Sequence, residues 1–224
     1  MKKKFGLYDL VVALLLAVLA FTCLIPILNA IAISFSDKTS AAVGRVTFFP
    51  INFNVSSYIQ ILQEGRFFVA FWVSIKRVVL GGLVNVFLVV LTAFPLSRDT
   101  RVFRNRNRFM WVIVFTMLFN GGLIPIFILV KGLNLLDSIW SLILPGAVPV
   151  FSVIILMNFF KGIPKSLEEA AVVDGANPLT ILARIFIPLA LPSIATITLF
   201  SIVGHWNAFF DGKIFINTLA NQPL

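Results

Sequence analysis

The chain has 224 residues, of which 59% are hydrophobic and only 12% are charged. An ordinary soluble domain is about 45–50% apolar and about 25% charged, so this composition excludes a soluble globular protein. The net charge of +9 would suggest nucleic-acid binding in a polar protein, but in so apolar a chain it is better explained by position relative to a bilayer. The single cysteine, Cys23, excludes an internal disulfide framework and is expected to pack as a small hydrophobic residue.

Five hydrophobic stretches are long enough to cross a membrane. A span needs about 20 mostly apolar residues, because the hydrocarbon core is about 30 Å thick and a helix rises 1.5 Å per residue. The stretches are residues 10–35, 78–97, 109–130, 139–160 and 188–210. They are too long for barrel strands and do not alternate with period two. The sequence therefore predicts an all-α integral membrane protein with a single transmembrane domain over residues 1–224.

The first stretch has features of a signal peptide, since Lys2, Lys3 and Lys4 precede it and Ala30-Ile31-Ala32 resembles a cleavage site. A signal core is 7–15 residues long, however, and this stretch is longer and contains Pro26. An uncleaved first span is favoured.

The basic residues predict the orientation. Eleven of the 18 fall on one side if the spans alternate: Lys2, Lys3, Lys4, Arg98, Arg101, Arg104, Arg106, Arg108, Lys161, Lys165 and Arg184. The positive-inside rule makes that side, and the N-terminus, cytoplasmic. The arginines of segment 98–108 could be mistaken for an RNA-binding arm, but between two spans they are better explained as a topology determinant that contacts anionic lipid. Lys76 and Arg77, at the outer mouth of the second span, are expected to reach the headgroups rather than to serve a pore.

The third and fourth spans are interrupted by helix-breaking residues. Asn120-Gly121-Gly122 with Pro125 interrupts one, and Pro145-Gly146 with Pro149 interrupts the other. Broken helices are tolerated at membrane depth where they line a cavity or pack against protein. A translocation path near the breaks and simple kinking for packing both remain open.

The cytoplasmic segment 161–187 carries helix signals. Ser166 and Glu169 form a capping box, and Gly175 supplies a left-handed stop, which predicts a helix of about two turns from Leu167 to Asp174. A second helix is expected to begin with Asn177 as N-cap and Pro178 at its first position.

The first of these helices has the chemistry of a docking element. An outward face with Ala170 and Ala171 allows close approach, and Glu168, Glu169 and Asp174 could meet basic groups of a partner. The alternative is an ordinary capped loop helix that lies on the membrane surface.

A resemblance bears on that choice. Glu169-Ala170-Ala171, Gly175 and Ile185-Phe186-Ile187-Pro188 occur at the spacing E-A-A-x3-G-x9-I-x-L-P, with Ile187 in place of Leu. This pattern resembles the cytoplasmic loop of permease subunits of binding-protein-dependent ABC importers. The segments 119–125 and 134–138 and the pair Trp206-Asn207 are similar to the carbohydrate-uptake branch, particularly the second permease of oligosaccharide systems.

The resemblance implies a permease-like helical bundle of ABC importer type I in the plasma (inner) membrane of a prokaryote. It implies four kinds of partner: a second permease subunit, two cytoplasmic ATPase subunits that grip the E-A-A loops, an external binding protein that delivers the sugar, and the lipid bilayer. The residues implied to couple to the ATPase are Glu168, Glu169, Ala170, Ala171, Asp174, Gly175 and Pro188. The family has six spans and no sixth hydrophobic run follows residue 210, so the sixth span is expected to be missing from this sequence.

The sequence contains no recognisable catalytic or nucleotide-binding motif. It lacks a G-x-x-x-x-G-K-[ST] phosphate loop, so ATP and Mg²⁺ are expected on the partner ATPase subunits, with no cofactor, metal or catalytic residue in this chain. His205, the only histidine, is expected to serve packing rather than a substrate or proton site. A permease of the same fold for a non-sugar solute, an autonomous secondary transporter or channel, and a structural scaffold remain alternatives.

The substrate path is expected near the first helix break and the outer end of the fifth span. The residues concerned are Asn120, Gly121, Gly122, Trp206 and Asn207. Amide side chains and an aromatic face suit the hydroxyls and the apolar ring face of a sugar. The alternative is that Asn120 caps a helix break and that Trp206 belongs to the interfacial aromatic belt.

Overall fold

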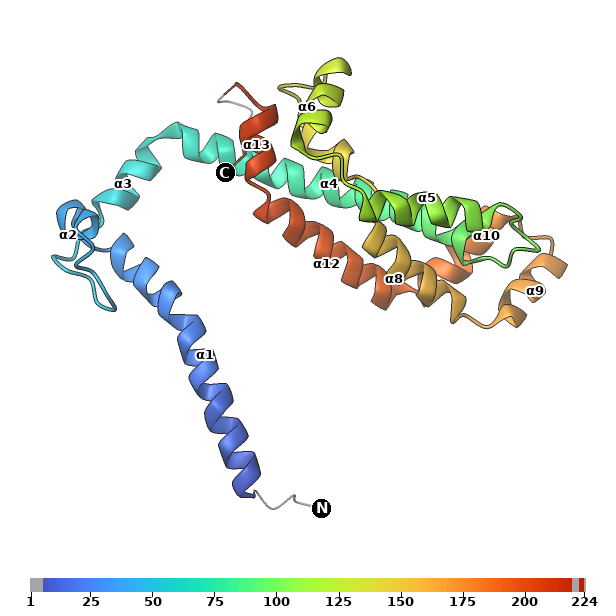
Figure 1. Ribbon diagram of the computed structural model, residues 1–224, viewed down its shortest axis with the longest axis horizontal. Helices are drawn as coiled ribbons and strands as arrows, with labels where there is room; N and C mark the ends of the chain where they lie inside the picture. Colours follow the sequence, from blue (N-terminus) through green and yellow to red (C-terminus); the bar gives the residue numbers. More distant parts are fainter. Residues whose placement is uncertain (1–5, 219–221, 224) are drawn as a thin grey trace. The chain divides into compact units, whose positions relative to one another are not determined.

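The computed structural model describes residues 6–218 and 222–223, and their regular structure is entirely helical, which confirms the all-α prediction (Figure 1). Lys2, Lys3 and Lys4, on which the predicted orientation partly depends, lie outside the described residues. The chain divides into two units, Met1–Phe67 and Phe68–Leu224. Each unit is described by itself.

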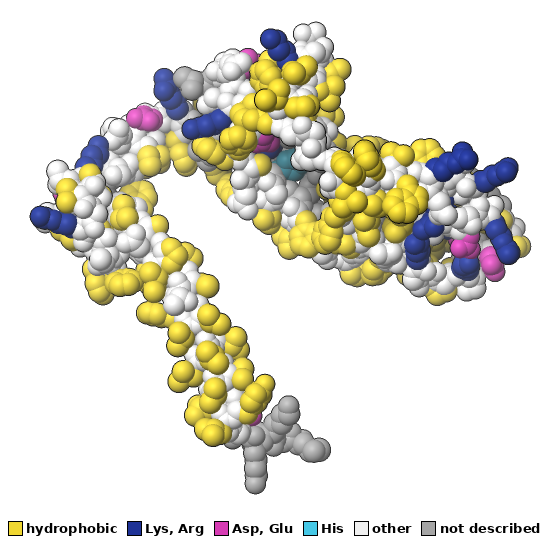
Figure 2. Space-filling view, in the orientation of Figure 1, with side chains coloured by type: hydrophobic (Ala, Val, Ile, Leu, Met, Phe, Trp, Pro, Cys, Tyr) yellow, Lys and Arg dark blue, Asp and Glu magenta, His cyan; other side chains and the backbone are white. Residues whose placement is uncertain are grey.

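The first unit contains the helices α1 (Leu7–Ser34), α2 (Lys38–Ala42) and α3 (Ser56–Gln63). Apolar side chains cover the face of α1 seen in Figure 2, exposed apolar residues recur along the whole helix, and within it only Ala32 is buried. A helix that is hydrophobic all round belongs in a membrane or in a protein core. Cys23 is free and exposed on this apolar helix.

Polar contacts hold the segment after α1 against the end of that helix. The Asn29 amide donates to the carbonyl oxygens of Val46 and Thr47, at 3.0 and 2.7 Å. Asp37 caps α2 by accepting from the Ser40 backbone N–H at 3.1 Å. Hydrogen bonds from Ser40 and then from Thr39 lower the pKa of Asp37 to about 2.

The second unit is built around α4 (Gly65–Ser97), which is 33 residues long. The other helices of the unit are α5 (Arg106–Leu118), α6 (Leu123–Gly132), α7 (Trp140–Ile143), α8 (Val150–Lys161), α9 (Lys165–Val173), α10 (Pro178–Ile181), α11 (Ile187–Leu189), α12 (Leu191–Asn207) and α13 (Phe210–Phe215). A 3₁₀ turn, Leu144–Gly146, follows α7, and a π-helical segment, Leu182–Phe186, joins α10 to α11. The buried residues of α4 recur every three or four positions, so a single face of the helix forms the centre of this unit.

Sharp bends fall where the sequence has its glycines and prolines. α5 and α6 meet at 115°, the α7 segment and α8 at 52°, and the segment Pro178–Leu189 meets α12 at 83°. Gly122 has φ +83 at the first bend, a conformation that favours glycine, and the Asn120 side chain accepts from the Gly122 N–H at 2.9 Å. The predicted interruptions at Asn120–Gly122 and Pro145–Pro149 are confirmed as helix breaks.

The main core lies where α4, α8 and the segment from α10 to α12 pack together. Its buried members include Val89, Phe94, Leu156, Phe160 and Phe186. The rings of Phe94, Phe160 and Phe186 meet edge to face, with centroids 5.3 to 6.3 Å apart.

Among the described residues, α1 and α4 are each long and apolar enough to cross a membrane, and the number rises to five if each bent pair counts as one span. The helices differ from the predicted stretches in one notable way, because α4 begins at Gly65 rather than near residue 78.

Candidate functional site

The helix of the E-A-A segment, α9, begins and ends near the predicted positions but with a different cap. It runs from Lys165 to Val173, and Pro164 occupies the N-cap position without a side-chain cap. The predicted capping box of Ser166 and Glu169 is therefore wrong. Ser166 already lies inside the helix, two positions after the N-cap, where its hydroxyl cannot cap the first turn.

The end of α9 follows the sequence signals. Gly175 has φ +78, and the N–H of Ala176 bonds back to the carbonyl of Ala171 at 2.9 Å, which confirms the left-handed stop. Asn177 caps α10 by accepting from the Thr180 N–H at 2.8 Å, and Pro178 occupies the first helical position, as predicted.

An arginine clamp holds α9 against the end of α4. The guanidinium of Arg98, directly after α4, forms an ion pair with Glu168 of α9. It also lies over the rings of Phe94 and Phe186, 4.1 and 4.4 Å from their centroids, so it touches α4, α9 and the π-helical segment together. Burial lowers the pKa of Arg98 and the charge of Glu168 opposes that shift, so the group stays charged.

A second, exposed ion pair links the same two segments. The Lys165 ammonium lies 2.5 Å from a carboxylate oxygen of Asp99. This hydrogen bond and the charge of Lys165 lower the pKa of Asp99, and Asp99 raises the pKa of Lys165 in return. Arg106, at the start of α5, donates to the carbonyl oxygen of Leu96 at 2.7 Å and so ties α5 to the end of α4. Basic side chains gather at this end of the second unit (Figure 2).

The outer surface of α9 and α10 is apolar without being covered. Val173 is 87% exposed, Leu179 69% and Val172 58%. Glu169, Ala170 and Asp174 are exposed as well. The expectation that Ala170 and Ala171 both face outward is wrong for Ala171, which packs against the main core because it lies on the opposite side of the helix from Val173.

The structure places the remaining predicted coupling residues as follows. Glu168 engages Arg98 of its own chain, so its carboxylate is already paired rather than free for a partner. Pro188 lies in α11, just before the bend into α12, where its missing N–H interrupts the helical ladder beside the π-helical segment.

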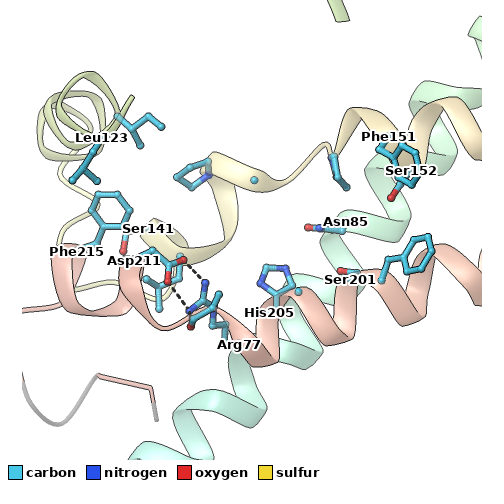
Figure 3. A pocket seen from close by; sticks show the side chains of 18 residues that line it. Arg77, Asn85, Leu123, Ser141, Phe151, Ser152, Ser201, His205, Asp211 and Phe215 are labelled. Carbon is cyan, nitrogen blue, oxygen red and sulfur yellow. Dashed lines mark hydrogen bonds and ion pairs between the residues drawn. The ribbon is translucent and has the colours of Figure 1, made fainter. Parts of the chain in front are cut away.

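A second feature is a pocket of about 710 Å³ within the second unit (Figure 3). Its walls are mostly apolar, and it is called the polar pocket here for the few polar side chains that line it. Its walls come from α4, the region from α6 to α8, α12 and α13. The residues that line it are Arg77, Asn85, Leu123, Ile126, Ser141, Leu142, Pro145, Gly146, Pro149, Phe151, Ser152, Phe200, Ser201, Gly204, His205, Ala208, Asp211 and Phe215. Pockets of this size commonly bind small molecules.

Arg77 and Asp211 form an ion pair at one end of the polar pocket. The Arg77 guanidinium pairs with the Asp211 carboxylate through two hydrogen bonds and donates to the Ala208 carbonyl oxygen at 2.7 Å. Arg77 is only 2% exposed. The expectation that Arg77 reaches toward lipid headgroups is therefore wrong, because it finds a carboxylate 134 residues away in the chain.

His205 lies against the backbone of α4. A methyl group added at Gly81 would come 2.6 Å from the Cε1 atom of the ring, so only glycine allows this approach. Packing is part of the role of His205, as predicted. The residue also lines the polar pocket, but its Nε2 atom is the ring atom nearest to Gly81 of α4, where it is buried without a hydrogen-bond partner among the described residues.

None of the five residues predicted for the substrate path lines the polar pocket. Asn120, Gly121, Gly122 and Asn207 are exposed, and Trp206 is half exposed with its ring edge against Phe71. Their part in a path stays a prediction.

A spacing signal in the sequence could have found the pocket residues. Arg77, Gly81 and Asn85 are four positions apart, as are Ser201 and His205, so each set follows one face of an otherwise apolar helix.

Comparisons with known proteins cover nearly the whole chain. The family model for inner membrane components of binding-protein-dependent transport systems matches residues 67–220. A polygalacturonan/rhamnogalacturonan transport system permease protein of Bacillus subtilis, YtcP, is 41% identical over 97% of this chain and 76% of its own length. The arabinooligosaccharides transport system permease protein AraQ of Halalkalibacterium halodurans is 29% identical over 86% of this chain and 70% of its own.

A solved structure is also similar. The crystal structure of a bacterial ABC transporter involved in the import of the acidic polysaccharide alginate contains a chain with a TM-score of 0.89 and 33% identity. The match covers all of this chain and 79% of that chain.

Proposed function

Because the chain belongs to the family of inner membrane components of binding-protein-dependent transport systems, we propose that it is a permease subunit of an ATP-driven carbohydrate importer. Two cytoplasmic ATPase subunits supply ATP hydrolysis, a second permease completes the path through the membrane, and an external binding protein delivers the sugar. This chain binds no nucleotide and contributes the passage and the contact with one ATPase subunit.

The observation that carries the proposal is the construction of α9. The short helix leaves Val172 and Val173 exposed, with Leu179 of α10 exposed after it, and uncovered apolar side chains of this kind mark a docking surface. The arginine clamp holds this helix on the end of α4, so force applied to α9 is transmitted to the long helix instead of being lost in a loose loop.

The sugar assignment rests on the relatives. The Bacillus subtilis, Halalkalibacterium halodurans and alginate proteins are all named for saccharide transport. The polar pocket supports this assignment, since it combines hydrogen-bonding groups with apolar walls.

The docking surface can be tested by replacing one exposed apolar residue with a charged one. Val173→Glu places a charge in the proposed contact without touching the core, so the ATPase subunit should co-purify poorly and sugar uptake should fall, while membrane insertion is kept. Val43→Glu is the matched control, because Val43 is also exposed, at 70%, but lies between α1 and α4. Equal ATPase recovery from both variants would count against docking through α9.

The proposed orientation places the N-terminus and α9 in the cytoplasm. In a Cys23→Ser background, a single cysteine at Asn105 should react with an impermeant thiol reagent only from inside, and one at Asn54 only from outside. The reverse pattern would overturn the topology.

A further inference from the structure

Unpartnered polar atoms concentrate at the polar pocket. Five buried side-chain nitrogen or oxygen atoms of the described residues have no hydrogen-bond partner, and four of them belong to residues that line this pocket: Arg77 Nε, Asn85 Oδ1, Ser201 Oγ and His205 Nε2. The fifth, Ser193 Oγ, lies elsewhere on α12. A buried polar atom without a partner costs about 1–3 kcal/mol, so four around one pocket call for an explanation.

Three of these side chains are nine-tenths or more buried, and they come from two helices. Arg77 and Asn85 lie on α4 at 2% and 7% exposure, and Ser201 lies on α12 at 8%. Figure 3 shows Asn85 on α4 near Ser201 and His205, which lie one turn apart on α12. The packing therefore brings them together at one place.

The chemistry of these atoms matches a hydroxyl better than an ion. Arg77 Nε donates, Asn85 Oδ1 accepts, and Ser201 Oγ does both. An anion would need donors only and a metal ion acceptors only, whereas a hydroxyl group uses both kinds. The pocket also has no spare formal charge, because Asp211 pairs with Arg77.

The aromatic residues in the walls of the pocket also suit a sugar. Phe151 and Phe200 lie together on one side, with ring centroids 6.4 Å apart, and Phe215 lies near the other end. Aromatic rings pack against the apolar face of a sugar, while the hydroxyl edge takes the polar groups.

We infer that the polar pocket is a binding site for the hydroxyl groups of a sugar ring, held by Arg77, Asn85 and Ser201 without any need for a carboxylate on the sugar. The inference rests on the proposed function, since a sugar must reach this pocket from the transport path. Binding supplies the missing hydrogen-bond partners, so the sugar-free pocket stores an unfavourable desolvation energy that the bound state releases.

The test measures equilibrium binding to the purified complex of this chain with its partner permease and ATPase subunits. The probes are arabinotriose, which is neutral, and trigalacturonate, which is acidic. Ser201→Ala removes one hydroxyl and should weaken the binding of both probes roughly three- to tenfold, the usual effect of one lost hydrogen bond. Asn85→Leu should weaken both at least as much, because it replaces a polar group with an apolar one of similar size.

Ser193→Ala is the matched control. It makes the same chemical change, at an equally buried and unpartnered hydroxyl of the same helix, outside the pocket. Its affinities should equal those of the parent complex. Equal weakening by Ser193→Ala and Ser201→Ala would mean that the effect comes through α12 itself, and would overturn the site.

The remaining outcomes are also decisive. Absence of binding by both probes overturns the site, and binding of trigalacturonate alone overturns the hydroxyl assignment in favour of recognition of a carboxylate by Arg77. ATP-driven uptake by the parent complex is measured separately. Sugar binding without ATP-driven uptake would support the binding site and contradict the proposed function. Uptake by the parent complex, together with an unchanged affinity in Ser201→Ala, would support the proposed function and contradict the binding site.

Discussion

Removing the arginine clamp should free α9 from the rest of the chain. Arg98→Met deletes the ion pair with Glu168 and the contacts with the rings of Phe94 and Phe186, while the new side chain keeps much of the apolar bulk. The Arg98 side chain is 10% exposed and that of Glu168 is 27% exposed, so the pair is screened less than a surface ion pair but is not fully buried.

The magnitude follows from these contacts. A hydrogen bond to a charged group contributes about 1.5–3 kcal/mol, and a partly desolvated cation–π contact adds about 0.5–2 kcal/mol. Allowing for the water that reaches Glu168, we expect Arg98→Met to weaken the attachment of α9 by about 2–3 kcal/mol. At about 2 kcal/mol, the fraction of molecules with α9 detached rises roughly thirtyfold.

The assay is amide hydrogen exchange across α9, combined with a double-mutant cycle. Arg98→Met and Glu168→Gln should each speed exchange in α9, and the double variant should be less severe than the sum, with a coupling energy of about 1–2 kcal/mol. The exposed pair of Lys165 and Asp99 is the control, because solvent and salt screen it and little coupling is expected. Additive effects of Arg98→Met and Glu168→Gln would refute the clamp.

Three further variants or conditions test other parts of the structure. Gly175→Val forces a branched side chain into a left-handed conformation at φ +78, and should cost about 1–2 kcal/mol of local stability and reduce recovery of the ATPase subunit, which quantitative co-purification measures. Gly81→Ala places a methyl group against the ring of His205, which should cost about 1–3 kcal/mol of stability. The thermal midpoint of the purified complex should therefore fall by several degrees, and an unchanged midpoint would mean that the ring is free to move away. The ion pair of Asp99 and Lys165 contributes to stability only while both groups are charged. Because the pKa of Asp99 is lowered, the contribution is fully present above about pH 4, and because the pKa of Lys165 is raised, it persists up to about pH 10. The carboxyl group of Asp99 should therefore titrate below its ordinary pKa, which NMR of the side-chain carbonyl carbon measures, and an ordinary or raised pKa would contradict the ion pair.

Local signals in the sequence predicted much of the fold. The helix breaks at Asn120–Gly122 and near Pro145, the stop at Gly175 and the cap at Asn177 all depend on residues within a few positions of the feature. Glycine widens and proline narrows the range of backbone conformations at its own position, whatever the distant environment, so such features can be predicted from sequence alone.

Features that depend on distant partners were not predictable in the same way. The sequence placed Arg77 at the end of a span, but in the structure it pairs with Asp211, 134 residues later in the chain. Likewise, the sequence suggested that Glu168 is a free carboxylate, but in the structure it pairs with Arg98 at the end of α4. In both cases the local sequence favoured exposure to headgroups or to a partner, and tertiary packing supplied an internal counter-charge instead.

The arginine clamp and the polar pocket are connected through the same two helices. α4 carries Arg77 and Asn85 on one wall of the pocket and ends directly before Arg98, about 18 Å further along the helix from Asn85. The opposite wall, on α12, is joined through the bend at Pro188 to Phe186, whose ring lies against the Arg98 guanidinium. Because closely packed interiors transmit displacement rather than absorb it, we expect a displacement of α9 to reach both walls of the pocket through the Arg98 side chain.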